Sequence, residues 1–210
     1  MTKEIESYIL SHSDEEGSLL AALNRDANVN LLRPRMLSGH LQGRILKMFC
    51  RMLNPKRVLE IGTYTGYATL CMAEALEKDA EIHTLEINDE MEDFIRKYVS
   101  QSPDKDKIKL YFGDAMEIIP ALDESFDLVF IDADKRLYSD YYDLIFDKLP
   151  AGALILADNT LWDGKVLEPL HPADKQTAGI LAFNDKIKAD QRVEKVILPL
   201  RDGLTMIWKK

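Results

Sequence analysis

Short apolar runs alternate with amphipathic segments along most of this chain. Runs suited to buried strands occupy 58–61, 81–85, 108–112, 126–131 and 153–157. Apolar residues at helical spacing follow them, at 66–76, 88–99, 115–122, 137–149 and 177–189. Strict alternation of strand and helix is typical of a parallel sheet covered by helices on both faces. We therefore predict an α/β fold.

The two ends of the chain depart from this alternation. The last two strands, 193–198 and 204–208, are joined through Asp202-Gly203, which is a hairpin signal. The last strand should therefore run antiparallel, which gives a Rossmann-like, doubly wound sheet of seven mostly parallel strands. Before residue 55 the pattern is helical, with Ser13 or Asp14 as a cap for the second helix. We predict a single domain over 1–210, with a helical cap at 1–54 and a core at 55–210.

Length and composition set broad limits on the class of protein. The chain has 210 residues, of which 46% are hydrophobic and 30% charged, which is ordinary for one globular domain. No apolar run has the length that crosses a membrane, and the N-terminus lacks a signal-peptide pattern. We expect a cytoplasmic protein. Cys50 and Cys71 lie in apolar helical patterns and are predicted to be buried thiols.

The charge balance bears on possible partners. A net charge of −9 repels polyanions, so generic nucleic-acid binding is disfavoured. A local basic patch is still possible among Arg33, Arg35, Arg44, Lys47 and Arg51. We interpret these residues as a solvated helix face.

Oxygen-rich side chains follow two of the predicted strands. Asp132-Ala133-Asp134-Lys135 comes after the run 126–131, and Asp158-Asn159 comes after 153–157. The carboxyl ends of neighbouring parallel strands share one edge of a sheet, where open α/β sheets bind ligands. Converging hard oxygen ligands suit Mg²⁺, Ca²⁺ or Mn²⁺, which makes Asp132, Asp158 and Asn159 candidate metal ligands. Ordinary turn and cap chemistry is the alternative.

The turn after the first strand carries Gly62 and Gly66. Glycines allow a sharp turn and the close approach of a ligand. The third glycine of a dinucleotide fingerprint is missing, and no phosphate-loop lysine follows. Glu60, beside the turn, would repel a pyrophosphate and attract an amino or sulfonium group.

Acidic residues also follow the second and third strands. Glu86 could accept hydrogen bonds from both hydroxyls of a ribose. The alternative is an exposed strand-end residue near a cap at Asn88 or Asp89. Asp114, followed by Ala115, could accept a hydrogen bond from an adenine amino group, although Asp114 also suits a helix N-cap.

These segments together resemble the metal-dependent class I O-methyltransferases that use S-adenosylmethionine, a family that includes catechol and caffeoyl-CoA O-methyltransferases. The most specific stretches are Asp132-Ala133-Asp134-Lys135 and Asp158-Asn159-Thr160-Leu161-Trp162. Arg35-Met36-Leu37-Ser38-Gly39, together with Gln42-Gly43, looks like the segment that lies over the cofactor in this family. The resemblance covers nearly the whole chain from about Asn30. It implies S-adenosylmethionine as methyl donor and a divalent cation, Mg²⁺ first and Mn²⁺ or Ca²⁺ as alternatives.

The resemblance also implies roles for single residues. Asp132, Asp158 and Asn159 match the metal ligands, and Lys135 matches the general base of catechol-type members. The positions that match the cofactor site are Met36, Glu60, Gly62, Tyr64, Ala68, Glu86, Asp114, Ala115 and Asp132. Ala68 replaces a serine of many relatives, and Thr205 stands near an acid that holds the substrate in catechol-type enzymes.

The chemistry of methyl transfer agrees with this set of residues. A phenol has a pKa near 10, which a nearby divalent cation lowers, and Lys135 could then accept the proton. The alternative is that Lys135 only neutralises Asp132 and Asp134.

We expect the acceptor to be a small molecule with vicinal hydroxyls, such as a catechol or a hydroxycinnamoyl ester. The resemblance further suggests a homodimer. One alternative acceptor is a hydroxylated uridine of transfer RNA, which the acidic balance disfavours. A non-catalytic binding module is at odds with the intact ligand set and Lys135. A nicotinamide dehydrogenase is at odds with the missing third glycine.

Overall fold

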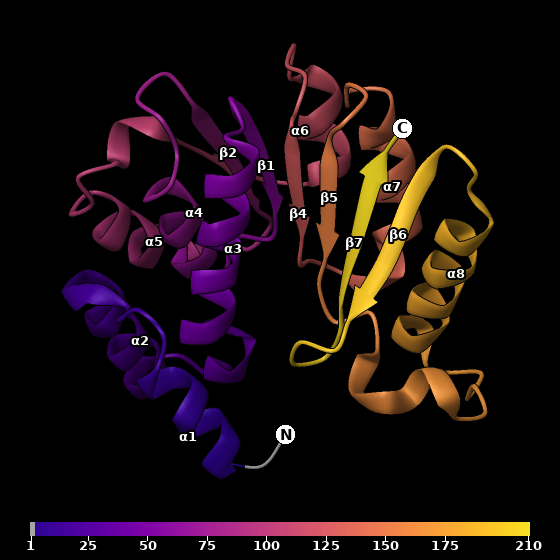
Figure 1. Cartoon of the computed structure of the whole chain (residues 1–210), viewed down its shortest axis with the longest axis horizontal. Helices are drawn as coiled ribbons and strands as arrows, with labels where there is room; N and C mark the ends of the chain where they lie inside the picture. The colour runs from indigo at the N-terminus through magenta and orange to yellow at the C-terminus, as the bar shows by residue number, and fades with distance from the viewer. Residues whose placement is uncertain (1–2) are drawn as a thin grey trace.

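The computed structural model describes residues 3–210, so the first two residues of the predicted cap lie outside the described range. Within that range seven strands form one sheet (Figure 1). They are β1 (Arg57–Ile61), β2 (Glu81–Glu86), β3 (Ile108–Phe112), β4 (Leu128–Ile131), β5 (Leu154–Ala157), β6 (Val193–Leu198) and β7 (Leu204–Lys209). Their order is β3-β2-β1-β4-β5-β7-β6, and β7 pairs antiparallel with both of its neighbours. The predicted doubly wound, mostly parallel sheet is confirmed.

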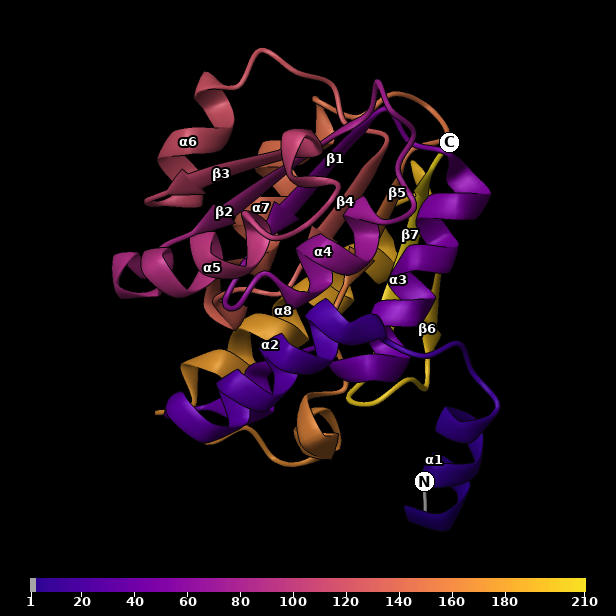
Figure 2. The same cartoon turned by 90° about the vertical axis from the view of Figure 1, so that its left-hand side faces the viewer.

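Helices cover both faces of this sheet (Figures 1 and 2). The α-helices are α1 (Lys3–Ser11), α2 (Gly17–Asn30), α3 (Gly39–Leu53), α4 (Tyr67–Ala73), α5 (Glu92–Val99), α6 (Ala115–Ala121), α7 (Tyr138–Phe146) and α8 (Lys175–Ala189). Short 3-10 turns are η1 (Pro34–Met36), η2 (Asp89–Met91), η3 (Lys105–Lys107), η4 (Lys135–Leu137) and η5 (Trp162–Leu167). Helices α2 to α5 pack on one face, and α6 to α8 pack on the other.

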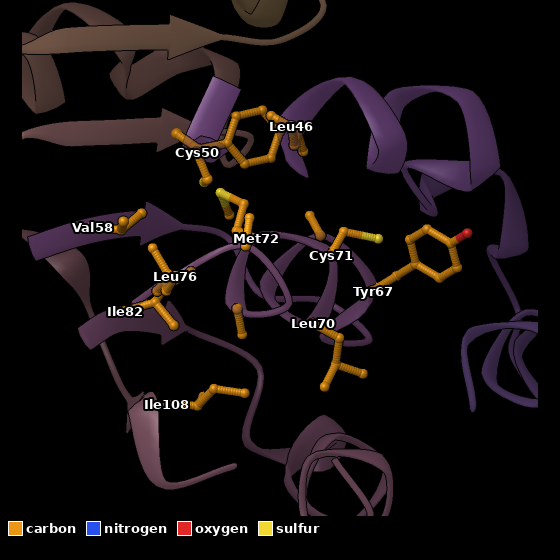
Figure 3. Packing of buried hydrophobic residues seen from close by; sticks show 14 of the residues in the cluster. Leu46, Cys50, Val58, Tyr67, Leu70, Cys71, Met72, Leu76, Ile82 and Ile108 are labelled. Carbon is orange, nitrogen blue, oxygen red and sulfur yellow. The ribbon is translucent and has the colours of Figure 1, made fainter. Parts of the chain in front are cut away.

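The first core lies between α3, α4 and the strands (Figure 3). Leu46 and Cys50 project from α3 one turn apart, and they share this core with Cys71 of α4 and Val58 of β1. Both cysteines are free and fully buried, as predicted. This packing joins the N-terminal helices to the centre of the sheet.

The second core is rich in aromatic side chains. Tyr138 and Tyr142 of α7 are fully buried, and each meets the ring of Phe183 edge-on, at centroid distances of 5.4 and 6.4 Å. Alternate residues of β4 contribute to the two cores, which explains its unbroken apolar run. This core places Tyr138, the first residue of α7, against the carboxyl ends of β4 and β5, where its hydroxyl lies 3.2 Å from the Ile131 carbonyl and 3.0 Å from the Asp158 carbonyl.

The structure differs from the predicted boundaries mainly at helix ends. The predicted caps Ser13 and Asp14 are wrong: Glu16 precedes α2 without a side-chain cap, and the Ser13 hydroxyl donates to the Ile9 carbonyl at 2.7 Å instead. Ser13 thus completes the end of α1 rather than the start of α2. A serine hydroxyl can bond either to the preceding helix or to the following one, and the pattern of apolar residues does not predict which bond forms.

The predicted solvated basic face is wrong for Arg44, which is buried. Its guanidinium lies 3.0 Å from Glu74 Oε2, and the Lys47 ammonium lies 2.8 Å from the same atom. Arg51 donates to the Glu74 carbonyl at 3.2 Å. Glu74 therefore binds three of the five basic side chains at the end of α4.

Among the described helices, none has the length and apolar character to span a membrane.

Candidate active site

Register brings two aspartates together at the carboxyl edge of the sheet. Ile131 of β4 lies opposite Ile61 of β1 and Ala157 of β5. One residue further, the Asp132 amide donates to the Ile61 carbonyl and the Asp158 amide donates to the Ile131 carbonyl, both at 2.9 Å. These bonds extend the strand pairing by one residue. They fix the backbones of Asp132 and Asp158 side by side.

The Asp158 carboxyl is only 2% exposed. Its Oδ2 accepts a hydrogen bond from Gln42 Nε2 at 2.8 Å, whereas its buried Oδ1 has no partner among the described residues. Burial, and then the charge of Asp132, raise the pKa of Asp158 to about 6. The two carboxyl groups therefore repel each other at this edge of the sheet, and within residues 3–210 the buried Asp158 lacks a compensating positive partner on Oδ1.

Lys135 lies beside this pair and is 6% exposed. Its Nζ donates to Asp132 Oδ1 at 2.7 Å and to the Tyr138 hydroxyl at 2.6 Å. Burial, followed by Asp132 and Asp158, holds the pKa of Tyr138 well above its ordinary value. The phenol therefore keeps its proton and can donate it to the Asp158 carbonyl, 3.0 Å away.

Close helix packing fixes the backbone of Lys135. A Cβ added to Gly179 of α8 would lie 2.4 Å from the Lys135 carbonyl oxygen. Only glycine therefore lets α8 approach the η4 turn so closely. The Nζ position is thus set by packing as well as by hydrogen bonds.

Asn159 follows Asp158 directly and adopts a left-handed backbone, with φ of 59°. Asparagine tolerates this conformation better than most residues. Its carbonyl accepts from the Trp162 amide at 3.1 Å, and Trp162 and Asp163 are also left-handed. The chain therefore turns sharply away from β5 here. A ligand role for the Asn159 side chain stays a prediction.

A small cleft adjoins the aspartates, and five of the nine predicted cofactor residues line it: Met36, Gly62, Tyr64, Ala68 and Asp132. The remaining walls come from Leu37, Ser38, Thr63, Thr65 and Tyr67. The cleft thus lies between the N-terminal segment, the glycine turn and the end of β4. A ligand in this cleft would therefore lie directly beside Asp132.

Gly62 makes the close approach between the turn and β4 possible. Its φ is 102°, and an added Cβ would lie 2.1 Å from the Asp132 carbonyl oxygen. Both the backbone conformation and the contact exclude a larger residue. The glycine therefore serves to bring the turn against Asp132.

Glu86 holds the same turn from the end of β2. Its Oε2 accepts from the Tyr64 amide at 2.6 Å, and its Oε1 accepts from the Asn88 amide at 2.9 Å. Asn88 in turn caps η2 by accepting from the Glu90 amide. A carboxylate oxygen has two lone pairs, so these bonds leave capacity for a ribose hydroxyl. That contact stays a prediction.

Glu60 and Asp114 do not line the cleft. Glu60 is fully buried under the turn, where its Oε2 accepts from the hydroxyls of Thr69 and Thr84. Burial raises the pKa of Glu60 to about 8. Asp114 caps α6 by accepting from the Met116 amide at 2.8 Å, which is the alternative considered for it. Cofactor contacts by Glu60, Asp114 and Ala115 stay predictions.

Thr205 also lies away from the cleft. It is buried, and its hydroxyl donates to the Thr160 hydroxyl at 2.7 Å. In this position it stabilises the segment after β5.

Two polar residues of the site carried no role in the predicted set. Gln42 is fully buried and contacts Asp158, and Arg201, in the loop between β6 and β7, donates to Gln42 Oε1 at 2.9 Å. Arg201 is 159 positions from Gln42, so no local sequence pattern predicts that the two side chains meet. Tyr138 was also missed, although its position three residues after Lys135 was a usable signal.

A larger surface depression, of about 600 Å³, lies between α5 and the edge strand β3. Its lining includes Arg96, Lys105 and Lys109 and none of the predicted site residues. The smaller cleft is the better candidate, because buried ionisable groups converge beside it.

The fold, together with the residues at the carboxyl ends of its strands, identifies the chain as a class I methyltransferase. The family model described as "O-methyltransferase" matches residues 10–210, and the chain belongs to this family. The predicted enzyme class, an S-adenosylmethionine-dependent O-methyltransferase, is confirmed.

Individual relatives agree with this assignment. The chain is 32% identical over 208 residues to a probable caffeoyl-CoA O-methyltransferase 2 of Dictyostelium discoideum. This alignment covers 97% of this chain and 90% of the relative. It is 33% identical over 190 residues to a catechol O-methyltransferase of Niastella koreensis, and this alignment covers 89% of this chain and 85% of the relative.

Solved structures show the same fold. The SAH-bound methyltransferase PaMTH1 of Podospora anserina superposes with a TM-score of 0.90 at 29% identity, covering 99% of this chain and 94% of that one. The O-methyltransferase TomG of Streptomyces achromogenes, in complex with SAM, gives 0.92 at 24% identity over the full length of both chains.

Proposed function

We propose that this enzyme transfers the methyl group of S-adenosylmethionine to one hydroxyl of a small aromatic acceptor with vicinal hydroxyls, of the catechol or hydroxycinnamoyl type. We also propose that a divalent cation assists the reaction. The observation that supports this most is the pair formed by the buried Asp158 and the partly exposed Asp132, which lies beside Lys135 at the edge of the cleft. The names of the relatives point to the same acceptors.

The residues at this edge fit a divalent cation. Asp158 Oδ1 is buried without a partner, which is costly for a carboxylate, and Asp132 adds repulsion. A cation between the two carboxylates would relieve both effects. Two carboxylates and the Asn159 amide form an oxygen-only donor set, which favours Mg²⁺ and tolerates Mn²⁺ or Ca²⁺. Once bound, the cation would supply Lewis acidity that lowers the pKa of a phenol hydroxyl.

Lys135 is proposed as the general base. In its amine form, Nζ accepts the hydroxyl proton while the acceptor oxygen bonds to the methyl carbon. The carbon–sulfur bond breaks, and the sulfur keeps the electron pair. Asp132 and Tyr138 hold Nζ at fixed distances, so the lysine needs little reorganisation. The enclosed position of Lys135 also limits competing water.

The cleft is proposed as the place of the methionine end of the cofactor. Glu86 would accept from the ribose hydroxyls, and Asp114 with Ala115 would border the adenine. Ala68 leaves this site without the hydroxyl that a serine would offer. Met36, half exposed in η1, would cover the bound cofactor from the N-terminal side.

Replacement of Asp158 tests the proposal. We expect Asp158→Ala to abolish methyl transfer, because the cation loses a ligand that no neighbour replaces. Affinity for S-adenosylhomocysteine, measured by calorimetry, should stay within about threefold, since Asp158 does not line the cleft. Asp143→Ala, on the exposed surface of α7, is the matched control. Full activity of Asp158→Ala would refute the metal-assisted reaction.

Transfer RNA remains the alternative acceptor. Glu74 engages Arg44 and Lys47, so these two side chains of the candidate basic patch are paired within the protein. A panel of catechols, hydroxycinnamoyl thioesters and transfer RNA separates the two acceptors. Label found in the RNA alone would overturn the small-molecule proposal.

We further propose a homodimer, on the strength of the family resemblance. Val196 of β6 and Trp208 of β7 are 52% and 42% exposed, and no helix crosses the near face of these strands in Figure 1. Sedimentation at the mass of one 24.0 kDa chain would refute this proposal. A cytoplasmic location stays a prediction.

A further inference from the structure

We propose that Gln42, oriented by Arg201, is a positioning residue that leaves one defined oxygen of Asp158 for the cation. This inference rests on the proposed function, since it concerns the same cation. It assigns a role to two residues outside the predicted ligand and base set.

Three distant segments meet at this point. Gln42 comes from the first turn of α3, Asp158 from the end of β5 and Arg201 from the loop between β6 and β7. Gln42 Nε2 donates to Asp158 Oδ2 at 2.8 Å, across 116 positions of sequence. Arg201 Nη1 donates to Gln42 Oε1 at 2.9 Å, across 159 positions. Gln42 is fully buried, so water does not replace either bond.

Arg201 determines which end of the Gln42 amide faces Asp158. An amide offers one acceptor oxygen and one donor nitrogen, whereas a guanidinium has donors only. Because Arg201 faces Oε1, the nitrogen must face the carboxylate. Without Arg201 the amide could rotate and present its oxygen to Asp158, which is a repulsive contact.

This orientation separates the roles of the two Asp158 oxygens. Oδ2 is engaged by Gln42, and Oδ1 is buried without a partner. A buried acceptor without a hydrogen-bond donor is rare in folded proteins and indicates an additional ligand. The amide thereby leaves Oδ1 for the cation and restrains the rotation of the carboxylate. Hydrogen-bonded partners of metal ligands act in this way in other proteins.

Arg201 also ties the site to the wall of the cleft. It donates to the Ser38 carbonyl, and Met36, Leu37 and Ser38 line the cleft. One exposed loop residue therefore holds both the cofactor wall and the buried amide. This contact places the relay from Arg201 through Gln42 to Asp158 at the junction of the two sites.

The test measures Mn²⁺ binding by electron paramagnetic resonance, with saturating S-adenosylhomocysteine and no acceptor. The variants are Gln42→Met, Arg201→Met and the double variant, and Arg192→Met, directly before β6 and far from the loop that carries Arg201, is the control. We expect Gln42→Met to weaken Mn²⁺ binding by about 10- to 100-fold. Arg201→Met should weaken it less, and the double variant should match Gln42→Met, because Arg201 acts through Gln42. Affinity of Gln42→Met for S-adenosylhomocysteine in EDTA should stay within about threefold.

The outcomes separate this inference from the proposed function. If the parent enzyme binds no Mn²⁺, both are overturned. If the parent binds Mn²⁺ and Gln42→Met binds it equally well, only the positioning role is overturned, and Gln42 serves packing alone. Additive losses in the double variant would overturn the relay through Gln42. If Gln42→Met does not fold, Arg201→Met decides, because it alters an exposed loop side chain, and an unchanged Mn²⁺ affinity would overturn the inference.

Discussion

Lys135 has two partners of different kinds, and they bear on its role. Asp132 accepts from Nζ, which is also what a purely neutralising lysine would show. The contact with Tyr138 is different, because a phenol that keeps its proton does not neutralise an ammonium. It fixes the direction of Nζ, which matters for a group that must meet a substrate proton.

Replacement of Lys135 distinguishes a base from a neutralising charge. Lys135→Met should lower the rate of methyl transfer by about 10² to 10⁴. Lys135→Arg should be almost as slow, because arginine keeps the charge but does not release its proton. Steady-state rates of both variants at saturating cofactor give the answer. Near-parent activity of Lys135→Arg would assign the residue to charge neutralisation.

Glu60 links the stability of the fold to pH. Its pKa lies at about 8 in the folded state, above an ordinary value of 4.5, because burial disfavours the charged form. The folded state therefore binds the proton more tightly than the unfolded state. The resulting stability is fully present below about pH 4.5 and is lost as the pH rises toward 8.

Glu60→Gln should flatten this pH dependence. Between pH 5 and pH 8 we expect the free energy of unfolding of the parent to fall by a few kcal/mol more than that of the variant. Urea denaturation across this range measures the difference. The pKa of Asp158 is also raised, but this residue is present in both proteins, so its contribution cancels in the difference between their unfolding free energies. Identical slopes would show that Glu60 is charged in the fold.

At the scale of elements, the site depends on how the strands end. The amides of Asp132 and Asp158 continue the pairing of β1, β4 and β5 by one residue, and the glycine turn packs against them. The backbones of the two aspartates are thus held by the hydrogen-bonded centre of the sheet. Precise placement of metal ligands requires such support.

Gly62→Ala tests the contact between the turn and β4. Alanine at a positive φ costs about 1–2 kcal/mol, and at Gly62 the clash with the Asp132 carbonyl adds to it. Gly152→Ala is the matched control, because its φ is 86° and nothing lies within 4 Å of an added Cβ. Thermal unfolding should show a clearly larger loss for Gly62→Ala. Equal losses would mean that the turn moves freely away from Asp132.

The elements also show how far the sequence could predict the structure. All seven strands were predictable, and for β1, β2, β4 and β5 the reason is burial on both faces, which leaves continuous apolar runs. Helix ends were less predictable. The Ser13 hydroxyl bonds to the Ile9 carbonyl at the end of α1, and the apolar pattern gives no sign of this choice. The aspartate pair was predictable from strand ends. Gln42 and Arg201 were not, because only the folded chain brings them together.

At the scale of the whole molecule, the N-terminal helices do more than cover the sheet. Helix α3 packs in the first core through Leu46 and Cys50, and it carries Gln42 to Asp158 on the same buried side. Ser38 and Met36, just before α3, border the cleft. The N-terminal region and the sheet therefore complete the site together, so removal of the first 54 residues would leave Asp158 without Gln42.

Dependence of methyl transfer on a divalent cation tests the central proposal most directly. The parent enzyme is dialysed against EDTA, and transfer from S-adenosylmethionine to catechol and to a hydroxycinnamoyl thioester is measured before and after Mg²⁺ is added. We expect at least about a 100-fold loss without the cation and full recovery with it. Transfer at the parent rate in EDTA would contradict a cation held by Asp132, Asp158 and Asn159.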